Sequence, residues 1–449
     1  MSTRWVHTAN RGVVAIPLLA ALSLLWLLRQ PDWTSFTTLY IDDGIFLNQA
    51  TVDPVGILAP HNGYLHLLPR LIAAIAAAFP LAYAPVVIAL LCATVLFAAM
   101  VIVWWTIKRS QRSWAPAAWI IAGILALVPV ASTETISVAA CLQWQLIAAG
   151  IVATALGRIT PKTTVPLAAL LLIAALSSPL ALVLLPGAAW LAWMARREAQ
   201  SWPLALLPGA ALIAALAVQA LVVLNTSVSD EAIGTAEVDL LSSTTAITFL
   251  EMNGPLALLG SPITRSIVSA GSIAVIVAFL ACTIAVAIAA RITSRAVTYE
   301  ESTARGEFAQ RLALLFGPGV AVIAISLVIR PAVRTLSMGN PGGTRYVLPL
   351  AYAMWVIVVL AIIALLADAR ERRSASERAG TRAGALAGAG IVIAVGLLAV
   401  HWDYSLGRPD GPRWSAAYGQ ACEGVKPDSV VTVSMSPPPW LTAVPCPPT

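Results

Sequence analysis

The sequence predicts an all-α, polytopic membrane protein. Hydrophobic residues make up 59% of its 449 residues, charged residues make up only 11%, and the mean hydropathy is +0.85. A soluble domain with this balance would lack the polar surface needed to cover its core. Apolar runs long enough to cross about 30 Å of hydrocarbon recur along the whole chain. The distribution of lysine and arginine between the connecting segments is the third indication of this class.

About eleven apolar segments account for most of the chain. The first follows Arg4 and Arg11, and polar residues rather than a small-residue cleavage site come after it, so we interpret it as a retained span and not a signal peptide. The expected spans are 13–28, 81–107, 115–131, 138–157, 164–177, 179–194, 204–224, 267–290, 312–329, 346–367 and 384–400.

Charge orients these spans. With the N-terminus inside, about 18 of the 27 Lys and Arg residues fall in inner segments, and about 14 of the 21 Asp and Glu residues fall outside. We therefore expect a multi-pass protein of the inner (plasma) membrane with its N-terminus in and its C-terminus out. The formal charge of +6 largely reflects this bias, so it indicates no nucleic-acid partner.

The predicted outer segments are unevenly sized. The transmembrane domain, 1–400, has outer loops at 29–80, 225–266 and 330–345, and the apolar second half of the first loop predicts a helix lying in the membrane interface. The tail, 401–449, is rich in proline and contains one β-like run, Ser429–Ser434. It is too small to be an independent domain, so we expect it to pack over the outer loops.

Two of the five cysteines, Cys422 and Cys446, share this tail. They could form a disulfide if the tail lies outside the membrane, where the environment is oxidising. The cysteines have no metal-like spacing, and His61 and His66 are five residues apart, which is not a zinc-binding spacing on a helix. The sequence therefore predicts no metal site and no cofactor.

The acidic pair Asp42-Asp43 stands out in a chain that has few charges. Adjacent side chains point about 100° apart on a helix, so only one of the two can easily face a reactant. A carboxylate held at the membrane surface could accept a proton from a hydroxyl as a general base. The alternative is an ordinary solvated loop or a helix N-cap. Which aspartate would be the base is open at this point.

Arginines on the predicted outer side are candidates for binding phosphate, because the guanidinium fork matches phosphate oxygens. Arg345 follows Gly342-Gly343, which leave the backbone free to approach a ligand, and it enters the next span at interface depth. The other candidates are Arg330, Arg334 and Arg70. The alternative for each is anchoring to lipid headgroups.

Residues that could contact a sugar lie near the same predicted face. Glu134, Trp144 and Gln145 are placed in the short outer loop between the third and fourth spans. Tyr64 and Tyr346 occur beside the candidate arginines. The alternative is an aromatic belt with an ordinary loop carboxylate.

Taken together, these residues resemble the GT-C superfamily of integral membrane glycosyltransferases, which use polyprenyl-phosphate-linked sugars. The resemblance rests on Tyr40-Ile41-Asp42-Asp43-Gly44, the run from Gly63 to Arg70, Glu134 with Gln143-Trp144-Gln145, Ser178-Pro179 and Gly342 to Tyr346. It implies that Asp42 or Asp43 is the catalytic base and that Arg345, with Arg330, Arg334 or Arg70, holds the donor phosphate. The short tail departs from the large outer domain of many members, which leaves acceptor recognition open.

The resemblance implies an inverting transferase that moves a sugar from a polyprenyl-phosphate donor to a glycan, lipid or protein acceptor at the outer face. A transporter or lipid-linked-sugar flippase is the alternative from another class. It would favour inverted repeats and ionisable residues in the middle of spans, of which the sequence has almost none. A non-catalytic scaffold is the third reading, and it predicts no convergence of the outer polar residues.

Overall fold

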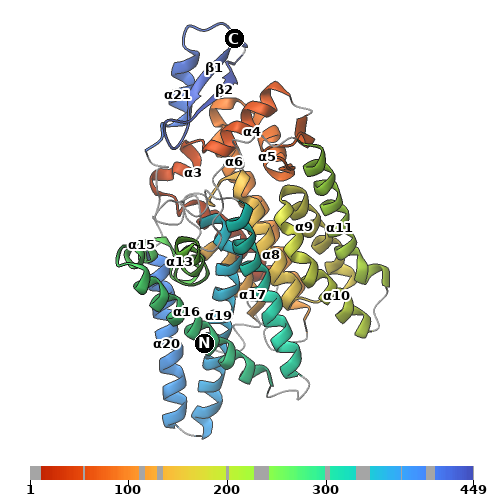
Figure 1. Ribbon diagram of the computed structural model, residues 1–449, viewed down its shortest axis with the longest axis vertical. Helices are drawn as coiled ribbons and strands as arrows, with labels where there is room; N and C mark the ends of the chain where they lie inside the picture. Colours follow the sequence, from red (N-terminus) through yellow and green to blue (C-terminus); the bar gives the residue numbers. More distant parts are fainter. Residues whose placement is uncertain are drawn as a thin grey trace.

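Long helices packed side by side form most of the molecule. The computed structural model describes residues 12–53, 56–110, 117–128, 135–198, 202–226, 242–298, 304–329, 344–375, 377–400 and 410–447. In Figure 1 the C-terminal tail lies at the top of the view, above α4 (Ile41–Val52), and the long helices extend below it.

Each predicted span contains a helix. These are α2 (Gly12–Leu27), α6 (Ala84–Lys108), α7 (Ala118–Leu127), α8 (Leu142–Leu156), α9 (Pro161–Ser177), α10 (Leu185–Arg197), α11 (Trp202–Asn225), α16 (Ser272–Thr298), α17 (Ala304–Ile329), α19 (Thr344–Ala375) and α20 (Glu377–Val400). Within the described ranges, eight helical segments are long and apolar enough to cross a membrane. Helices α7 and α9 are shorter, and α2 bends by 81° into the segment Pro31–Thr37.

The chain is therefore an all-α polytopic membrane protein, as the sequence predicts. The count of eleven spans and the orientation of the termini stay predictions. Exposed apolar side chains on α11, α16 and α20 fit this environment: Leu221, Ile273 and Val392 are 61%, 79% and 71% exposed. In a bilayer such side chains face lipid rather than water.

Local sequence signals explain where the helices begin. Proline occupies the first or second position of α6, α9 and α10, where the missing N–H would have no partner inside the helix in any case. Thr160 also caps α9: its hydroxyl accepts the Thr163 N–H, and the Thr163 hydroxyl accepts the Thr160 N–H.

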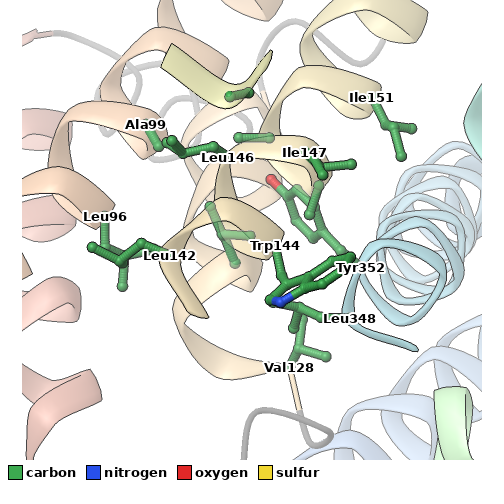
Figure 2. Close-up of a cluster of buried hydrophobic side chains, with 14 of the residues drawn as sticks. Leu96, Ala99, Val128, Leu142, Trp144, Leu146, Ile147, Ile151, Leu348 and Tyr352 are labelled. Atoms are coloured by element: carbon green, nitrogen blue, oxygen red, sulfur yellow. The ribbon is translucent and has the colours of Figure 1, made fainter. Parts of the chain in front are cut away.

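Helix α8 is the centre of the core. All 15 of its residues are buried, and it packs on α6, α9, α17 and α19. Small residues such as Ala149 and Gly150 let these helices approach closely, which is how helices associate inside a membrane. Figure 2 shows the Trp144 indole of α8 beside Leu348 of α19, and the Tyr352 hydroxyl donates to the Ile121 carbonyl of α7.

Shorter helices gather at one end of this core. They include η1 (Pro31–Trp33), α3 (Thr34–Thr37), α4, η2 (Gly56–Leu58), α5 (Leu67–Ala77), η3 (Leu81–Tyr83), η5 (Ala139–Cys141) and η6 (Pro179–Leu184). After α11 come α13 (Ser243–Glu251), the π-helical η7 (Met252–Leu256), α14 (Ala257–Leu259) and α15 (Ser261–Ser269). Helix α5, expected in the membrane interface, buries six residues and packs on α4, α6 and α9.

Arg29 joins the bend after α2 to the end of α7. Its side chain is only 1% exposed and donates to the carbonyls of Ala126 and Val128 at 2.8 and 3.1 Å. These carbonyls lie at the C-terminal end of α7, where backbone acceptors have no partner within the helix. Arg29 therefore has a structural role.

The tail is a small unit held by a disulfide. Helix α21 (Trp414–Cys422) precedes an antiparallel hairpin of β1 (Val430–Ser434) and β2 (Leu441–Pro445), and Cys422 is bonded to Cys446. The predicted β-like run is thus confirmed as β1. The tail packs on α4 and on η3, where the Trp414 indole donates to the Leu81 carbonyl at 2.6 Å.

Candidate functional site

Helix α4 begins where the tail meets the first predicted outer loop. The Ile41 N–H donates to the Ser436 carbonyl at 3.1 Å, and the Ser436 N–H donates to the Leu39 carbonyl at 2.9 Å. These bonds fix the backbone one residue before the acidic pair. Both aspartates then fall in the first turn of α4, where the helix dipole favours negative charge.

The two aspartates face different surroundings. Asp43 is 3% exposed, and its Oδ1 accepts the N–H of Ala140, in η5 just before α8, at 3.3 Å. The Asp42 side chain is 35% exposed and lines a cavity. The structure therefore gives Asp43 an anchoring position and Asp42 the position that can meet a reactant.

Arg345 reaches the same cavity from the start of α19. Its Nη1 lies 3.5 Å from Asp42 Oδ2, although the two residues are 303 positions apart in the chain. Its guanidinium carbon lies 5.3 Å from the centre of the Tyr346 ring, and that ring meets Trp144 edge-on at 4.8 Å. The fold thus brings the expected carboxylate, arginine and aromatic residues to one place.

The cavity has a volume of about 490 Å³, and its lining is polar in one part and apolar in another. This is within the usual range for a small-molecule site, roughly 300–1,000 Å³. Polar lining residues besides Asp42 and Arg345 are His61, Asn62, Tyr64, His66, Gln143, Ser178 and Ser326. Its apolar wall includes Leu180 and Leu182 of η6, Val223 of α11 and Ile325 of α17.

A tight turn presents several of the polar residues. His61 and Tyr64 exchange backbone hydrogen bonds around Asn62 and Gly63, which both have positive φ, as a two-residue turn of this kind requires. The Tyr64 and His66 rings lie 4.0 Å apart, centre to centre. The turn is held from α11, because the Gln219 side chain donates to the Leu65 carbonyl and accepts the Leu65 N–H, both at 3.0 Å.

Arg70 does not line the cavity, in contrast to the role expected from sequence. It is 6% exposed and donates to the carbonyls of Gly56 and Pro60 at 2.9 and 3.4 Å. Its guanidinium also lies over the Phe46 ring at 5.6 Å. Burial lowers the pKa of Arg70, and the nearby Asp53 raises it. Its donors hold the loop before the tight turn, so we assign it a structural role.

The remaining predicted residues divide into two groups. Trp144 and Gln145 lie in the first turn of α8 and not in a loop. Trp144 lines the cavity, whereas Gln145 is 1% exposed and donates to the Thr135 carbonyl at 2.8 Å. Glu134, Arg330, Arg334, Gly342 and Gly343 lie outside the described residues.

Gln143 is the main residue that the sequence analysis left unassigned. It is 4% exposed and lines the cavity, and no hydrogen-bond donor among the described residues reaches its Oε1. A buried amide oxygen without a donor loses hydrogen-bonding energy unless a ligand or water supplies one. Its signal was present in Gln143-Trp144-Gln145, but the sequence does not reveal which glutamine faces inward.

A scan against protein-family models, a search of curated proteins and a search of solved structures each found no match for this chain. Among the described residues, no cluster of three His, Cys, Asp or Glu side chains could hold a metal ion.

Proposed function

We propose that this protein is a membrane glycosyltransferase that moves a sugar from a polyprenyl-phosphate donor to a glycan, lipid or protein acceptor at the outer face of the inner membrane. The observation that carries the proposal is the convergence of Asp42 and Arg345, 3.5 Å apart, at a cavity with an apolar wall. A general base and a phosphate-binding cation are the two groups that this reaction needs.

Asp42 takes the acceptor proton. As the acceptor O–H proton moves to the carboxylate, the acceptor oxygen forms a bond to the anomeric carbon of the donor sugar. The bond from that carbon to the phosphate oxygen breaks, and polyprenyl phosphate leaves with the electron pair. One base and one displacement give inversion at the anomeric carbon, and a positioned base contributes about 10²–10⁴ in rate.

Arg345 binds the phosphate. Its guanidinium has five N–H donors in a fixed fork, so it can contact Asp42 and still offer donors to phosphate oxygens. Negative charge grows on the phosphate as it leaves, and a positioned cation stabilises that charge more in the transition state than in the ground state.

The apolar wall supports a lipid-linked donor. Val223 and Leu182 line the cavity and are also each 43% exposed, so the cavity wall continues into the apolar outer surface of α11 and η6. A polyprenyl chain could lie along this surface within the bilayer while its phosphate reaches Arg345. Anchoring the lipid in this way converts part of the binding energy into positioning of the reactive carbon.

The polar lining supports a sugar between these two groups. Gln143 Oε1 needs a donor, which a sugar hydroxyl provides, and the rings of Tyr64, Trp144 and Tyr346 offer apolar faces. This arrangement matches the usual ligand site, in which a few polar groups orient a ligand held by apolar contacts.

The test is a transfer assay with the full chain in nanodiscs. Labelled polyprenyl-phosphate sugars are supplied with cell-envelope glycans, lipids and proteins as acceptors. The label transferred from the polyprenyl phosphate to each acceptor is then measured. We expect transfer by the native protein and by Asp410→Asn, a matched change of an exposed carboxylate in the tail, but not by Asp42→Asn. Movement of the intact donor across a vesicle membrane without transfer would instead identify a flippase.

A further inference from the structure

A second cavity lies between α4 and the hairpin of the tail. Its volume is about 350 Å³, and it is separate in its lining residues from the cavity of Asp42 and Arg345. It is lined by Ile45, Asn48 and Gln49 of α4 and by Thr432, Leu441, Thr442 and Ala443 of the hairpin. We call it the tail groove.

The tail groove exists because the hairpin is fixed to α4. The Thr442 hydroxyl donates to the Gly44 carbonyl at 2.8 Å, in the turn that carries Asp42. Met435 packs so closely on Gly44 that a Cβ at this position would overlap its sulfur. The disulfide between Cys422 and Cys446 ties the end of β2 to α21. These contacts give the groove two defined walls.

The chemistry of the lining points to a neutral, hydroxyl-rich ligand. Among the described residues no charged side chain lines the groove, and its polar groups are the amides of Asn48 and Gln49 and the hydroxyls of Thr432 and Thr442. Primary amides both donate and accept hydrogen bonds, as sugar hydroxyls do. Leu441 and the half-exposed Trp440 beside it provide apolar surface for the faces of sugar rings.

The position of the groove relates it to the reaction site. Gln49 follows Asp42 by seven residues, or about two turns, so both side chains lie on nearly the same side of α4, about 10 Å apart along its axis. A ligand lying along α4 can therefore occupy the groove while its end approaches Asp42. A single sugar is too short for this, whereas an oligosaccharide is long enough.

We propose that the tail groove is an acceptor subsite that binds a neutral glycan and directs its terminal hydroxyl toward Asp42. The inference rests on the proposed function for its role in transfer, but glycan binding itself can be measured without transfer. In this proposal the short tail supplies one wall of the acceptor site, in place of a separate binding domain.

The experiment compares Asn48→Ala/Gln49→Ala with the native protein and with Gln420→Ala, which removes an exposed amide from α21 outside the groove. Binding of short neutral oligosaccharides is measured by saturation-transfer NMR on the full chain in nanodiscs, and transfer is measured against acceptor concentration. Loss of two neutral hydrogen bonds predicts about a tenfold higher acceptor KM, with kcat and the rate of donor hydrolysis nearly unchanged. Gln420→Ala should match the native protein.

The outcomes separate the two proposals. If Asp42→Asn abolishes transfer but Asn48→Ala/Gln49→Ala keeps the native acceptor KM and oligosaccharide signal, the tail groove is not an acceptor subsite and the proposed function stands. If the native protein transfers no sugar but binds oligosaccharides through Asn48 and Gln49, the glycan site stands and the transferase proposal fails. Thermal unfolding of each variant shows whether the groove residues affect the fold.

Discussion

Two neighbouring carboxylates at the start of α4 lie in regions with opposite properties. Asp42 faces a cavity of about 490 Å³ beside Arg345, whereas Asp43 is buried against the backbone of η5. The residue type and the helix are the same, so the difference comes from the direction of each side chain. Two identical chemical groups therefore have different surroundings because the helix is held in one rotation about its axis.

Two neighbouring units fix that rotation. On one side, the N–H of Ala140 binds Asp43, and on another, the tail binds Gly44 and Ile41. Because α4 is short, its own hydrogen bonds cannot set its orientation in the molecule. The position of Asp42 at the cavity consequently depends in part on Ser436 and Thr442 of the tail, which do not line the cavity.

The largest expected effect comes from Asp42→Asn. The amide cannot accept the acceptor proton, so transfer should fall by about 10²–10⁴, while the melting temperature stays near that of the native protein. Asp43→Asn is the matched control, because its Oδ1 can still accept the Ala140 N–H and activity should change only slightly. If Asp43→Asn is the inactive variant instead, the roles that we assign to the two carboxylates are reversed.

The next largest effect is expected from substitutions at Arg345, which lines the cavity beside Asp42. Loss of charged hydrogen bonds to phosphate predicts that Arg345→Ala slows transfer about a hundredfold, and Arg345→Lys about tenfold, since lysine keeps the charge but loses the fork. Both donor KM and kcat should change. Arg413→Ala, which removes an exposed arginine of the tail, is the control. Equal rates for arginine and lysine would favour headgroup anchoring and remove Arg345 from the site.

The carboxylate of Glu251 shows how burial changes the pKa of an acidic side chain. Glu251 in α13 is 2% exposed, no donor in the described part of the chain reaches its Oε2, and burial raises its pKa from 4.5 to about 7. Between these values the folded state holds a proton that the unfolded state has released. The free energy of unfolding therefore decreases as pH rises through this window, by roughly 3 kcal/mol in total.

Glu251→Gln should abolish this decrease in the free energy of unfolding with rising pH, because glutamine does not titrate. Unfolding is followed from about pH 5 to about pH 8, and the native melting temperature should fall across this range more steeply than that of the glutamine variant. Glu423→Gln, an exposed glutamate in the tail, should keep the native slope. The same slope in all three proteins would show that Glu251 does not stay protonated in the fold.

Removing the disulfide between Cys422 and Cys446 tests whether the tail holds α4 in place. Cys422 and Cys446 are 24 positions apart, and closing a loop of this size contributes roughly 3 kcal/mol in the chain-entropy account. Cys422→Ser/Cys446→Ser should therefore loosen the hairpin and raise hydrogen exchange at β1, β2 and the first turn of α4. Cys282→Ser, a free cysteine in α16, is the control. Unchanged exchange in α4 would show that the tail does not fix this helix.

The fold class, and part of the candidate site, could be predicted from the sequence for a simple reason. Apolar runs specify membrane helices almost alone, and scarce charged residues between them, such as Asp42 and Arg345, stand out. Side-chain direction could not be predicted, because it depends on how each helix packs. Gln143 lines the cavity but Gln145 faces Thr135, and Arg70 turns to loop carbonyls instead of the cavity.

The tail was predictable only in part for a related reason. The β-like run and the two cysteines are local features, and both are visible in the sequence. The contact of Thr442 with Gly44 joins residues 398 positions apart, and the sequence contains no local signal for it. The absence of a Cβ at Gly44 becomes meaningful only once Met435 is known to lie against it.

The smallest expected effect is that of Asp43→Ala. This change leaves the Ala140 N–H buried without an acceptor, and such a group costs about 1–3 kcal/mol. We expect the free energy of unfolding to fall by that amount, with transfer reduced far less than in Asp42→Asn because the cavity keeps its base. Chemical unfolding in detergent measures the first quantity and the nanodisc assay the second. Asp43→Asn should restore most of the stability, because an amide oxygen replaces the missing acceptor. If Asp43→Ala retains native stability but loses transfer completely, Asp43 acts in the reaction itself and the anchoring role is wrong.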